Sequence, residues 1–300
     1  MVPLVGVEPT CREAHDFESC VSANSTTAAT PIYTIVTWQF PGYHKLTMAR
    51  IIGILNAKGG TGKTTTAANL SAYLSALGKY VLLVDTDPQA NATTGLGIYL
   101  KEDHLNLYHT LMGDYEPDAI IRKTSLLGFD LLPAAPNLAG ANVELVNVQE
   151  REFWLKKVLN KIRTNYDYIV IDSGPSLGIL TINSLAASEG IIIPVQCEYY
   201  ALEGLSQLLS TIDLVRNSLN PALEIYGVAL TMYDKRNALS QQVADEVRKN
   251  FPGRVFNTMI PRAVSLAAAP SYGKTVFQFD PDSKGALAYR QLAEEVIQLT

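Results

Sequence analysis

The sequence predicts an α/β fold in which a doubly wound, mostly parallel sheet is flanked by helices. From Met48 onward, short β-rich runs alternate with helical patterns, which is typical of β-α-β units and a parallel sheet. The runs are almost continuously apolar, as expected of strands covered on both faces. We expect strands at 51–55, 81–85, 129–132, 168–172, 191–195 and 226–231.

Helices are predicted between these strands from apolar spacing. One helix begins near Lys63, directly after a glycine-rich stretch. A final helix is expected from about residue 285 to 298. Another amphipathic helix ends before Asn220-Pro221, and its apolar residues recur at three- and four-residue steps: Leu202, Leu205, Leu208, Leu209, Ile212 and Val215.

Composition places the chain among ordinary soluble globular proteins of one or two domains. It has 300 residues, 47% hydrophobic and 18% charged, with a formal net charge of −5, so there is no global basic field to attract nucleic acid or membrane. Cys11, Cys20 and Cys197 have no metal-ligand spacing and form no even set, which indicates a reducing, cytoplasmic compartment. No apolar run approaches the roughly 18 residues of a membrane helix.

The first 47 residues differ from the rest. Residues 22–30 are a run of small side chains, followed by prolines and isolated aromatics without a sustained period, so we expect little fixed structure there. Met48 leads directly into the first strand. We therefore expect 1–47 to be an appended tail or a translation start assigned too early, and 48–300 to form a single domain.

A phosphate-binding loop follows the first strand. The stretch NAKGGTGKTT, residues 56–65, nearly fits G-x-x-x-x-G-K-[ST], with Ala57 where the first glycine belongs. In such a P-loop NTPase-like context, glycines let backbone N–H groups converge on phosphate oxygens at a helix N-terminus. Lys63 would bridge the outer phosphates, and Thr64 would supply a hydroxyl to Mg²⁺. The nucleotide-binding residues that this loop predicts are Gly59, Gly60, Thr61, Gly62, Lys63, Thr64 and Thr65.

Carboxylates come at the ends of two predicted strands. Asp85 and Asp87 follow an apolar run at the edge where open α/β sheets bind ligands, which indicates a metal or water role, although both could instead cap the following turn. Asp172 ends the run 168–171, as in a Walker B strand whose carboxylate holds Mg²⁺ through water.

The second lysine of the loop is the feature that a simple phosphate cradle leaves unexplained. Residues 58–64, KGGTGKT, resemble the deviant Walker A loop of the ParA/MinD ATPases. The resemblance implies that Lys58 reaches across a nucleotide sandwich homodimer to the partner's phosphates while Lys63 serves its own subunit. It also implies that Asp87 orients the attacking water, that Asp85 supports the Mg²⁺ shell, and that Lys58, Asp87 and Lys63 form the catalytic set.

The resemblance covers nearly all of 50–298 and indicates the chromosomal, Soj-like ParA branch. It rests also on Arg151-Glu152, on 231–234, on 260–262 and on 269–274. It implies an adenine pocket near Met232, Pro261 and Arg262, although strand-end packing alone could give the same spacing.

Family membership of this kind implies a Mg²⁺-dependent ATPase that segregates DNA. ATP would drive dimerisation, the dimer would bind nucleoid DNA without sequence preference, and a ParB-type partner would stimulate hydrolysis and release. Basic side chains for DNA are available in the C-terminal third, but Ser265 and Asp282 stand where the family commonly has arginine, which weakens the patch. The basic side chains are Arg216, Lys235, Arg236, Arg248, Lys249, Arg254, Lys274, Lys284 and Arg290.

Other ATPases with this loop are possible alternatives. A MinD-like membrane switch for division-site placement predicts a basic amphipathic C-terminal helix, whereas residues 291–300 carry two acids and no lysine. A nitrogenase-iron-protein-like reductase needs a cysteine pair for its cluster, and only Cys197 remains after residue 47. A ligase of the dethiobiotin-synthetase kind would share the loop, but the Asp87-Pro88-Gln89 segment favours ParA.

Overall fold

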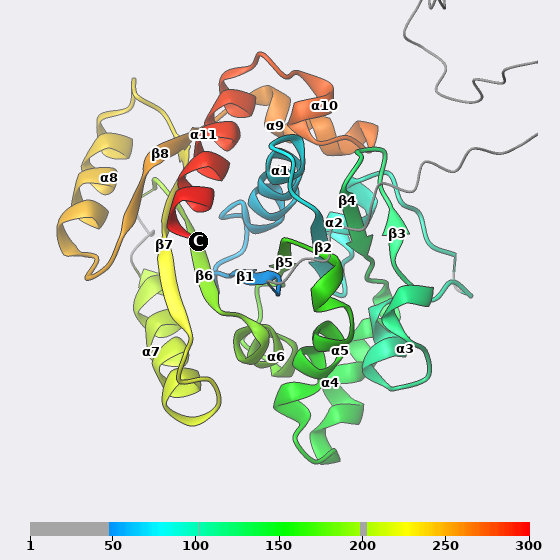
Figure 1. Ribbon diagram of the computed structural model, residues 1–300. Helices are drawn as coiled ribbons and strands as arrows, with labels where there is room; N and C mark the ends of the chain where they lie inside the picture. The colour runs from blue at the N-terminus through cyan, green and yellow to red at the C-terminus, as the bar shows by residue number, and fades with distance from the viewer. Residues whose placement is uncertain (1–47, 102, 199–202) are drawn as a thin grey trace, which may run out of the picture. The chain divides into compact units, whose positions relative to one another are not determined.

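The computed structural model describes residues 48–101, 103–198 and 203–300 (Figure 1). Its described strands form one sheet in the order β3-β4-β2-β5-β1-β6-β7-β8. All neighbours pair in parallel except β3 with β4. The strands are β1 Arg50–Ile54, β2 Val81–Asp85, β3 Arg122–Lys123, β4 Phe129–Leu132, β5 Tyr168–Asp172, β6 Gly190–Gln196, β7 Glu224–Tyr233 and β8 Val255–Pro261.

The predicted fold class is confirmed, and six of these strands lie where the sequence placed them. Two strands escaped prediction for physical reasons. β3 has only two residues, both charged, and pairs at the edge of the sheet. β8 is the other edge strand: its burial alternates and its register with β7 is irregular, so it lacks the continuous apolar character of the central strands.

Helices connect the strands and cover both faces of the sheet. The two predicted helices at the C-terminal side lie at α7 and α11, and Leu202 lies outside the described residues. The first predicted helix begins at Lys63 as expected. The helices are α1 Lys63–Ala76, α2 Asn91–Gly95, α3 Leu107–Leu111, α4 Ala141–Glu144, α5 Trp154–Ile162, α6 Ile179–Ala187, α7 Glu203–Ser218, α8 Ala238–Asn250, α9 Val264–Ala268, α10 Val276–Phe279 and α11 Lys284–Leu299.

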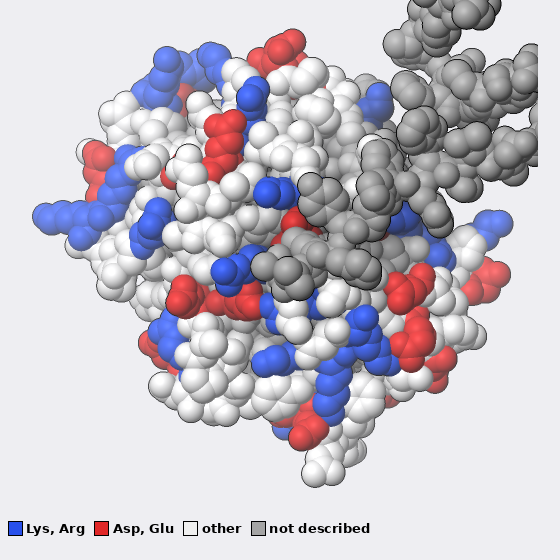
Figure 2. All heavy atoms as spheres, in the orientation of Figure 1, with Lys and Arg blue, Asp and Glu red and all other residues white. Residues whose placement is uncertain are grey.

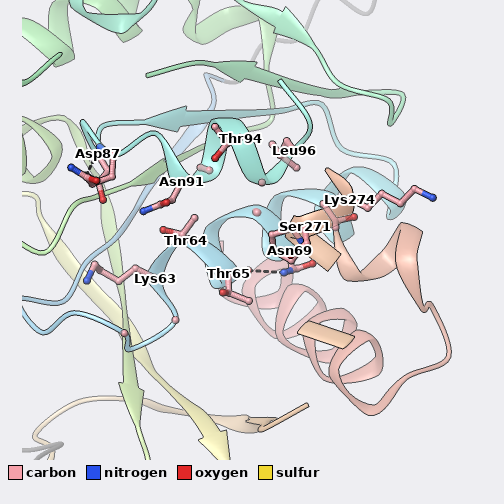
Figure 3. A pocket seen from close by; sticks show the side chains of 18 of the residues that line it. Lys63, Thr64, Thr65, Asn69, Asp87, Asn91, Thr94, Leu96, Ser271 and Lys274 are labelled. Carbon is pink, nitrogen blue, oxygen red and sulfur yellow. Dashed lines mark hydrogen bonds between the residues drawn. The ribbon is translucent and has the colours of Figure 1, made fainter. Parts of the chain in front are cut away.

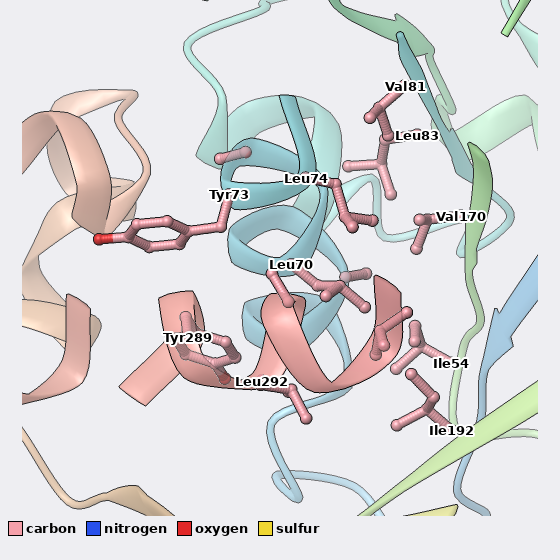
Figure 4. Close-up of a cluster of buried hydrophobic side chains, with 14 of the residues drawn as sticks. Ile54, Leu70, Tyr73, Leu74, Val81, Leu83, Val170, Ile192, Tyr289 and Leu292 are labelled. Carbon is pink, nitrogen blue, oxygen red and sulfur yellow. The ribbon is translucent and has the colours of Figure 1, made fainter. Parts of the chain in front are cut away.

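Alternate residues of the central strands face two separate cores. Ile52 and Ile54 of β1 pack with α1 and α11, and Figure 4 shows Leu70, Leu74 and Leu292 of these helices directed toward the strands. Ile51 of the same strand packs with α3, α5 and α6 on the opposite face. On that face α7 and α8 extend the core over β6 and β7. Because successive side chains of a strand point to opposite faces, the apolar runs are buried on both sides.

The sheet topology brings the predicted site residues to one edge. Asp172 at the end of β5 is in register with Ile54 of β1 and with Asp85 of β2. The next strand in the chain, β2, lies on the β5 side of β1, whereas β6 pairs with β1 on its other side. The loop after β1 therefore lies where the strand order reverses, the position at which open α/β sheets bind ligands. The expected division at residue 48 stays a prediction, because 1–47 lie outside the described residues. None of the described helices combines the length and the apolar composition needed to cross a bilayer.

Candidate active site

The glycine-rich loop of residues 55–62 joins β1 to α1. Gly60 and Gly62 have φ of 73° and 88°, a backbone conformation that L side chains adopt only at a cost. Gly62 precedes the helix, no side chain caps it, and the first intrahelical bond runs from Thr66 N–H to the Gly62 carbonyl (2.8 Å). The backbone N–H groups before Thr66 therefore have no helical partner, which makes the N-terminus of α1 an anion-binding position.

A cavity of about 650 Å³ lies against this loop. Figure 3 shows Lys63, Thr64 and Asp87 toward one end of it and Ser271 and Lys274 toward the other. The volume is within the roughly 300–1,000 Å³ of ligand sites in proteins. The predicted site residues that line it are Gly59, Gly60, Gly62, Lys63, Thr64, Thr65, Asp87 and Met232.

Lys63 is held inside the loop. Its side chain is buried, and Nζ donates a hydrogen bond of 2.9 Å to the backbone carbonyl of Lys58. Burial lowers the pKa of Lys63, and the nearby charges of Asp172 and Asp87 oppose that shift. A lysine desolvated in this way gains from a negatively charged ligand, because the ligand compensates the cost of burying the ammonium.

Lys58 is positioned differently. Asn56 fixes its backbone: Asn56 Oδ1 accepts from Lys58 N–H (3.0 Å), and Asn56 Nδ2 donates to the Pro194 carbonyl of β6 (2.7 Å). Lys58 is half-buried, and it is not among the residues that line the cavity of its own subunit. Thr61, also predicted to bind nucleotide, is buried behind the lining, with its hydroxyl 3.4 Å from the Lys58 carbonyl.

Asp85 and Asp172 are adjacent on neighbouring strands and fully buried, but their surroundings differ. Asp85 Oδ1 accepts from Asp87 N–H (3.1 Å), and its Oδ2 accepts from the N–H (2.9 Å) and the hydroxyl (2.7 Å) of Thr93. Burial raises the pKa of Asp85 to about 6, and these hydrogen bonds oppose the shift. Asp85 is thus engaged in holding the segment after β2.

Neither carboxylate oxygen of Asp172 has a hydrogen-bond partner of normal geometry among the described residues. Burial, and then the charge of Asp85, hold the pKa of Asp172 well above its ordinary value, while the Thr64 hydroxyl and Lys63 act in the opposite direction. A buried carboxylate without a partner is costly unless a cation compensates it. Asp172 and the adjacent Thr64 therefore fit Mg²⁺, an ion that takes one or two protein oxygens together with phosphates and water. The described residues contain no group of three His, Cys, Asp or Glu side chains placed to hold a metal.

Asp87 lines the cavity and has a constrained carboxylate. Its Oδ1 accepts from Gln89 N–H (3.0 Å). A Cβ built on Gly174 would lie 3.3 Å from Asp87 Cγ, tighter than an ordinary contact. Because Gly174 has no side chain, the turn after β5 can lie close to the Asp87 carboxylate, which follows β2.

The three residues predicted near the adenine do not come together in this cavity. Met232 lines it, with φ of 52°, in the left-handed region. Pro261 pairs with Tyr233 at the ends of β8 and β7 and is not a lining residue. Arg262 donates its backbone N–H to the Tyr233 carbonyl (3.1 Å) and its guanidinium to Glu198 (2.7 Å), also outside the lining.

Two segments that the motifs did not assign to the site form the far wall of the cavity. One is α2 with its continuation to Tyr99, and the other is the 270–275 segment. They cross at Gly97 and Gly273, both with positive φ, where a Cβ on Gly273 would lie 2.7 Å from Gly97 Cα. The glycines were a visible signal of turns, but the sequence could not show that they contact each other. The lining residues that motif reasoning missed are Ala68, Asn69, Gln89, Asn91, Ala92, Thr94, Gly95, Leu96, Tyr99, Pro270, Ser271, Lys274 and Thr275.

Known proteins resemble this chain over the described region. A family model described as AAA domain matches residues 49–225. The sporulation initiation inhibitor protein Soj of Bacillus subtilis is 53% identical over 249 residues, which cover 83% of this chain and 98% of that protein. The chromosome-partitioning ATPase Soj of Thermus thermophilus is 51% identical over 249 residues, which cover 83% of this chain and 95% of that protein.

A solved structure also resembles this chain. Cobyrinic acid a,c-diamide synthase of Mycobacterium smegmatis, determined with bound ATP analogue and magnesium, superimposes with a TM-score of 0.75. It is 38% identical, and the match covers 83% of this chain and 95% of that one. Since the family model spans more than half of the chain and both Soj proteins match over nearly their whole length, the chain belongs to the Soj/ParA family of P-loop ATPases and hydrolyses ATP.

Proposed function

We propose that this protein is a DNA-partitioning ATPase whose ATP-bound form is a face-to-face homodimer. In this proposal the dimer binds nucleoid DNA without sequence preference, and a ParB-type protein stimulates hydrolysis and thereby releases the dimer. The chromosome-partitioning ATPase Soj of T. thermophilus supports the partitioning role. The protein would act in the cytoplasm, associated with the nucleoid.

The position of Lys58 is the observation that carries the dimer proposal. The loop contains two lysines, but only Lys63 lines the cavity of its own subunit. Asn56 holds the Lys58 backbone at the start of the loop, so that residue has a defined position beside the phosphate site. A lysine whose backbone is fixed there, and which does not line its own cavity, would be placed to neutralise phosphates that a second subunit presents.

The hydrolytic roles would fall to groups near Lys63 and Thr64, of which Asp172 and Asp85 are fully buried and lie outside the cavity lining. Asp172 and Thr64 would hold Mg²⁺, with Asp85 behind them fixing the segment after β2. Bound Mg²⁺ supplies neutralisation of phosphate charge. Asp87 would orient the attacking water, because its carboxylate lines the cavity and the Gln89 N–H holds it in place. The adenine would lie near Met232, with Pro261 and Arg262 beside Tyr233 and outside the cavity lining.

DNA binding would use exposed basic side chains of the C-terminal third, where blue side chains are interspersed with red ones in Figure 2. Three of the nine basic candidates form ion pairs with nearby carboxylates: Arg216 with Asp213, Arg236 with Asp234 and Arg290 with Glu294. Exposed pairs of this kind are weak and can be exchanged for phosphate contacts. The remaining candidates are Lys235, Arg248, Lys249, Arg254, Lys274 and Lys284.

A membrane-bound alternative is not favoured by the position of the last helix. The apolar residues of α11 include Tyr289, Leu292 and Val296, and all three are buried in the core beside α1. An amphipathic helix that binds a membrane surface needs its apolar face for the lipid.

The test measures mass and DNA retention with ATP and with ADP. We expect wild type to double in mass with ATP, and to bind DNA only in that state with affinity that falls steeply with salt, because cation release accompanies phosphate contacts. Lys58→Ala should stay monomeric with ATP. Unchanged dimerisation and unchanged ATP turnover in Lys58→Ala would end the shared-site proposal, and DNA binding that ignores nucleotide or salt would contradict the switch.

A further inference from the structure

We propose that Thr231 is a positioning residue for ATP binding: its hydroxyl holds the phosphate loop in the conformation that receives the nucleotide. This inference rests on the ATP-hydrolysing activity of the family and not on dimerisation or DNA binding. Thr231 does not line the cavity, so its effect is exerted through the loop.

The contact itself joins the end of β7 to the last turn of the loop. Thr231 Oγ1 donates a hydrogen bond of 2.8 Å to the carbonyl of Thr61, and both residues are 2% exposed. A Cβ built on Gly62 would lie 3.8 Å from the Thr231 methyl group, which is ordinary van der Waals contact. Thr231 therefore hydrogen-bonds Thr61 and lies beside Gly62.

Fixing this peptide fixes a donor of the phosphate site. The Thr61 carbonyl and the Gly62 N–H belong to one planar trans peptide unit and point in opposite directions. With the carbonyl held toward Thr231, the Gly62 N–H is directed away from β7, and Gly62 is a lining residue of the cavity. Because Gly62 is a glycine at φ 88°, its own conformational preference is weak, so an external contact has to select one orientation.

The anchor is rigid because Thr231 is itself held by the sheet. It pairs with Gln196 of β6, and its carbonyl accepts the Cys197 N–H (3.0 Å). At the other end of the loop, Asn56 bonds the β6 carbonyl of Pro194 (2.7 Å). The loop is thus tied at its start to β6 and at its end to β7, while Gly59 and Gly60 between the ties are exposed.

Thr231 also precedes Met232, which lines the cavity in a left-handed conformation. The same short segment therefore sets the orientation of a phosphate-loop peptide and supplies a wall residue. Removing the hydroxyl should loosen the loop without changing any group that touches the nucleotide.

The experiment compares two buried threonines that make the same kind of contact. Thr110 Oγ1 donates to the Tyr115 carbonyl, also at 2.8 Å, and Thr110 is 4% exposed, in α3 and outside the cavity lining. Thr231→Val and Thr110→Val each delete one buried hydroxyl and keep the side-chain shape. We expect Thr231→Val to lose at least as much thermal stability as Thr110→Val, since the Thr61 acceptor is buried whereas the Tyr115 acceptor belongs to an exposed residue that water can reach.

Affinity for a fluorescent ADP analogue, measured on the full-length monomer, separates the two variants. Thr231→Val should weaken ADP binding about tenfold, and Thr110→Val less than about twofold. Thr231→Ser, which keeps the hydroxyl, should bind within about twofold of wild type. In turnover, Thr231→Val should raise KM for ATP by about the same factor as the loss of ADP affinity and change kcat less than about threefold.

Equal ADP affinity in the two valine variants would overturn the proposal, and so would a serine variant as weak as the valine variant. If Thr231→Val fails to fold, the same comparison is made with Thr231→Ala and Thr110→Ala. ADP binding by the monomer needs no partner subunit, so failure here is distinct from failure of the dimer proposal.

Discussion

Lys63 Nζ lies 2.9 Å from the backbone carbonyl of Lys58, so the two lysines of the phosphate loop are joined through the side chain of one and the main chain of the other. The contact gives the buried ammonium of Lys63 an acceptor inside the loop. The acceptor is a backbone carbonyl, so this contact does not involve the Lys58 side chain. The two lysines should therefore respond differently to mutation.

Replacing each lysine by alanine should separate binding within a subunit from binding between subunits. Lys63→Ala should weaken ADP binding on the order of 100-fold, the scale of losing a charge-assisted phosphate contact. Lys58→Ala should change monomer ADP affinity less than about threefold, because Lys58 does not line the cavity. Calorimetric titration with ADP measures both, and comparable losses in the two variants would contradict the separation.

Asp172→Asn should stabilise the ligand-free protein at pH 8 and abolish Mg²⁺-dependent turnover. The folded-state pKa of Asp172 is raised by burial and by Asp85. The folded protein therefore binds a proton that the unfolded chain does not, and wild-type stability rises as the pH falls through that raised pKa toward the ordinary value of 3.8. The neutral amide removes this pH dependence. At pH 8 the variant should have a higher Tm than wild type, by about 2–4 °C for each kcal/mol gained in the free energy of unfolding, and this gain should shrink at lower pH.

The measurement is a Tm series from pH 5 to pH 8 without nucleotide, with ATP turnover measured beside it. A variant less stable than wild type at every pH would show that the Asp172 carboxylate is compensated within the protein. A rate of Mg²⁺-dependent ATP turnover equal to that of wild type would contradict the role of Asp172 in holding the metal.

Asp87→Ala should slow chemistry and leave nucleotide binding nearly unchanged. A carboxylate that positions a water contributes on the order of 10²-fold to the rate. ATP should therefore accumulate on the protein, and the ATP-bound dimer should persist. Single-turnover hydrolysis measures the rate, and ADP affinity is the internal control. A rate equal to that of wild type would refute the role assigned to Asp87.

Gly273→Ala should displace the far wall of the cavity. Its φ of 64° penalises alanine, and the new Cβ would lie 2.7 Å from the Gly97 backbone. Gly78→Ala is the matched control, since Gly78 has φ of 84° with open space around its Cβ position. Each substitution should lower the free energy of unfolding by about 1 kcal/mol through backbone strain. Gly273→Ala should lower it by about 1–3 kcal/mol more, because of the clash with Gly97, and should also weaken ATP binding. Chemical denaturation measures the stability and ATP titration measures the affinity. Equal losses of stability in the two variants would show that the backbone at Gly97 moves to accept the new Cβ.

The central part of the fold could be predicted because its determinants are local. The strands at 81–85, 129–132 and 168–172 have the predicted bounds, since their apolar runs are buried on both faces. β8 could not be predicted in this way. It is an edge strand with a register shift, and Glu295 of α11 accepts the N–H groups of Asn257 (2.9 Å) and Thr258 (2.8 Å), a contact that no local pattern reveals.

The candidate site divides in the same way. The order of residues alone identified the phosphate loop, both of its lysines and three carboxylates at strand ends, because a nucleotide loop is a short contiguous segment whose backbone does the binding. Only the tertiary structure decided that Asp85 is satisfied by Thr93, whereas the Asp172 carboxylate has no hydrogen-bond partner of normal geometry among the described residues, and that Arg262 lies in a surface ion pair. The same holds for the Thr231 contact and the Gly97–Gly273 crossing, which join segments far apart in the chain. Such contacts depend on how strands and loops are brought together in space, and sequence spacing carries no information about that distance.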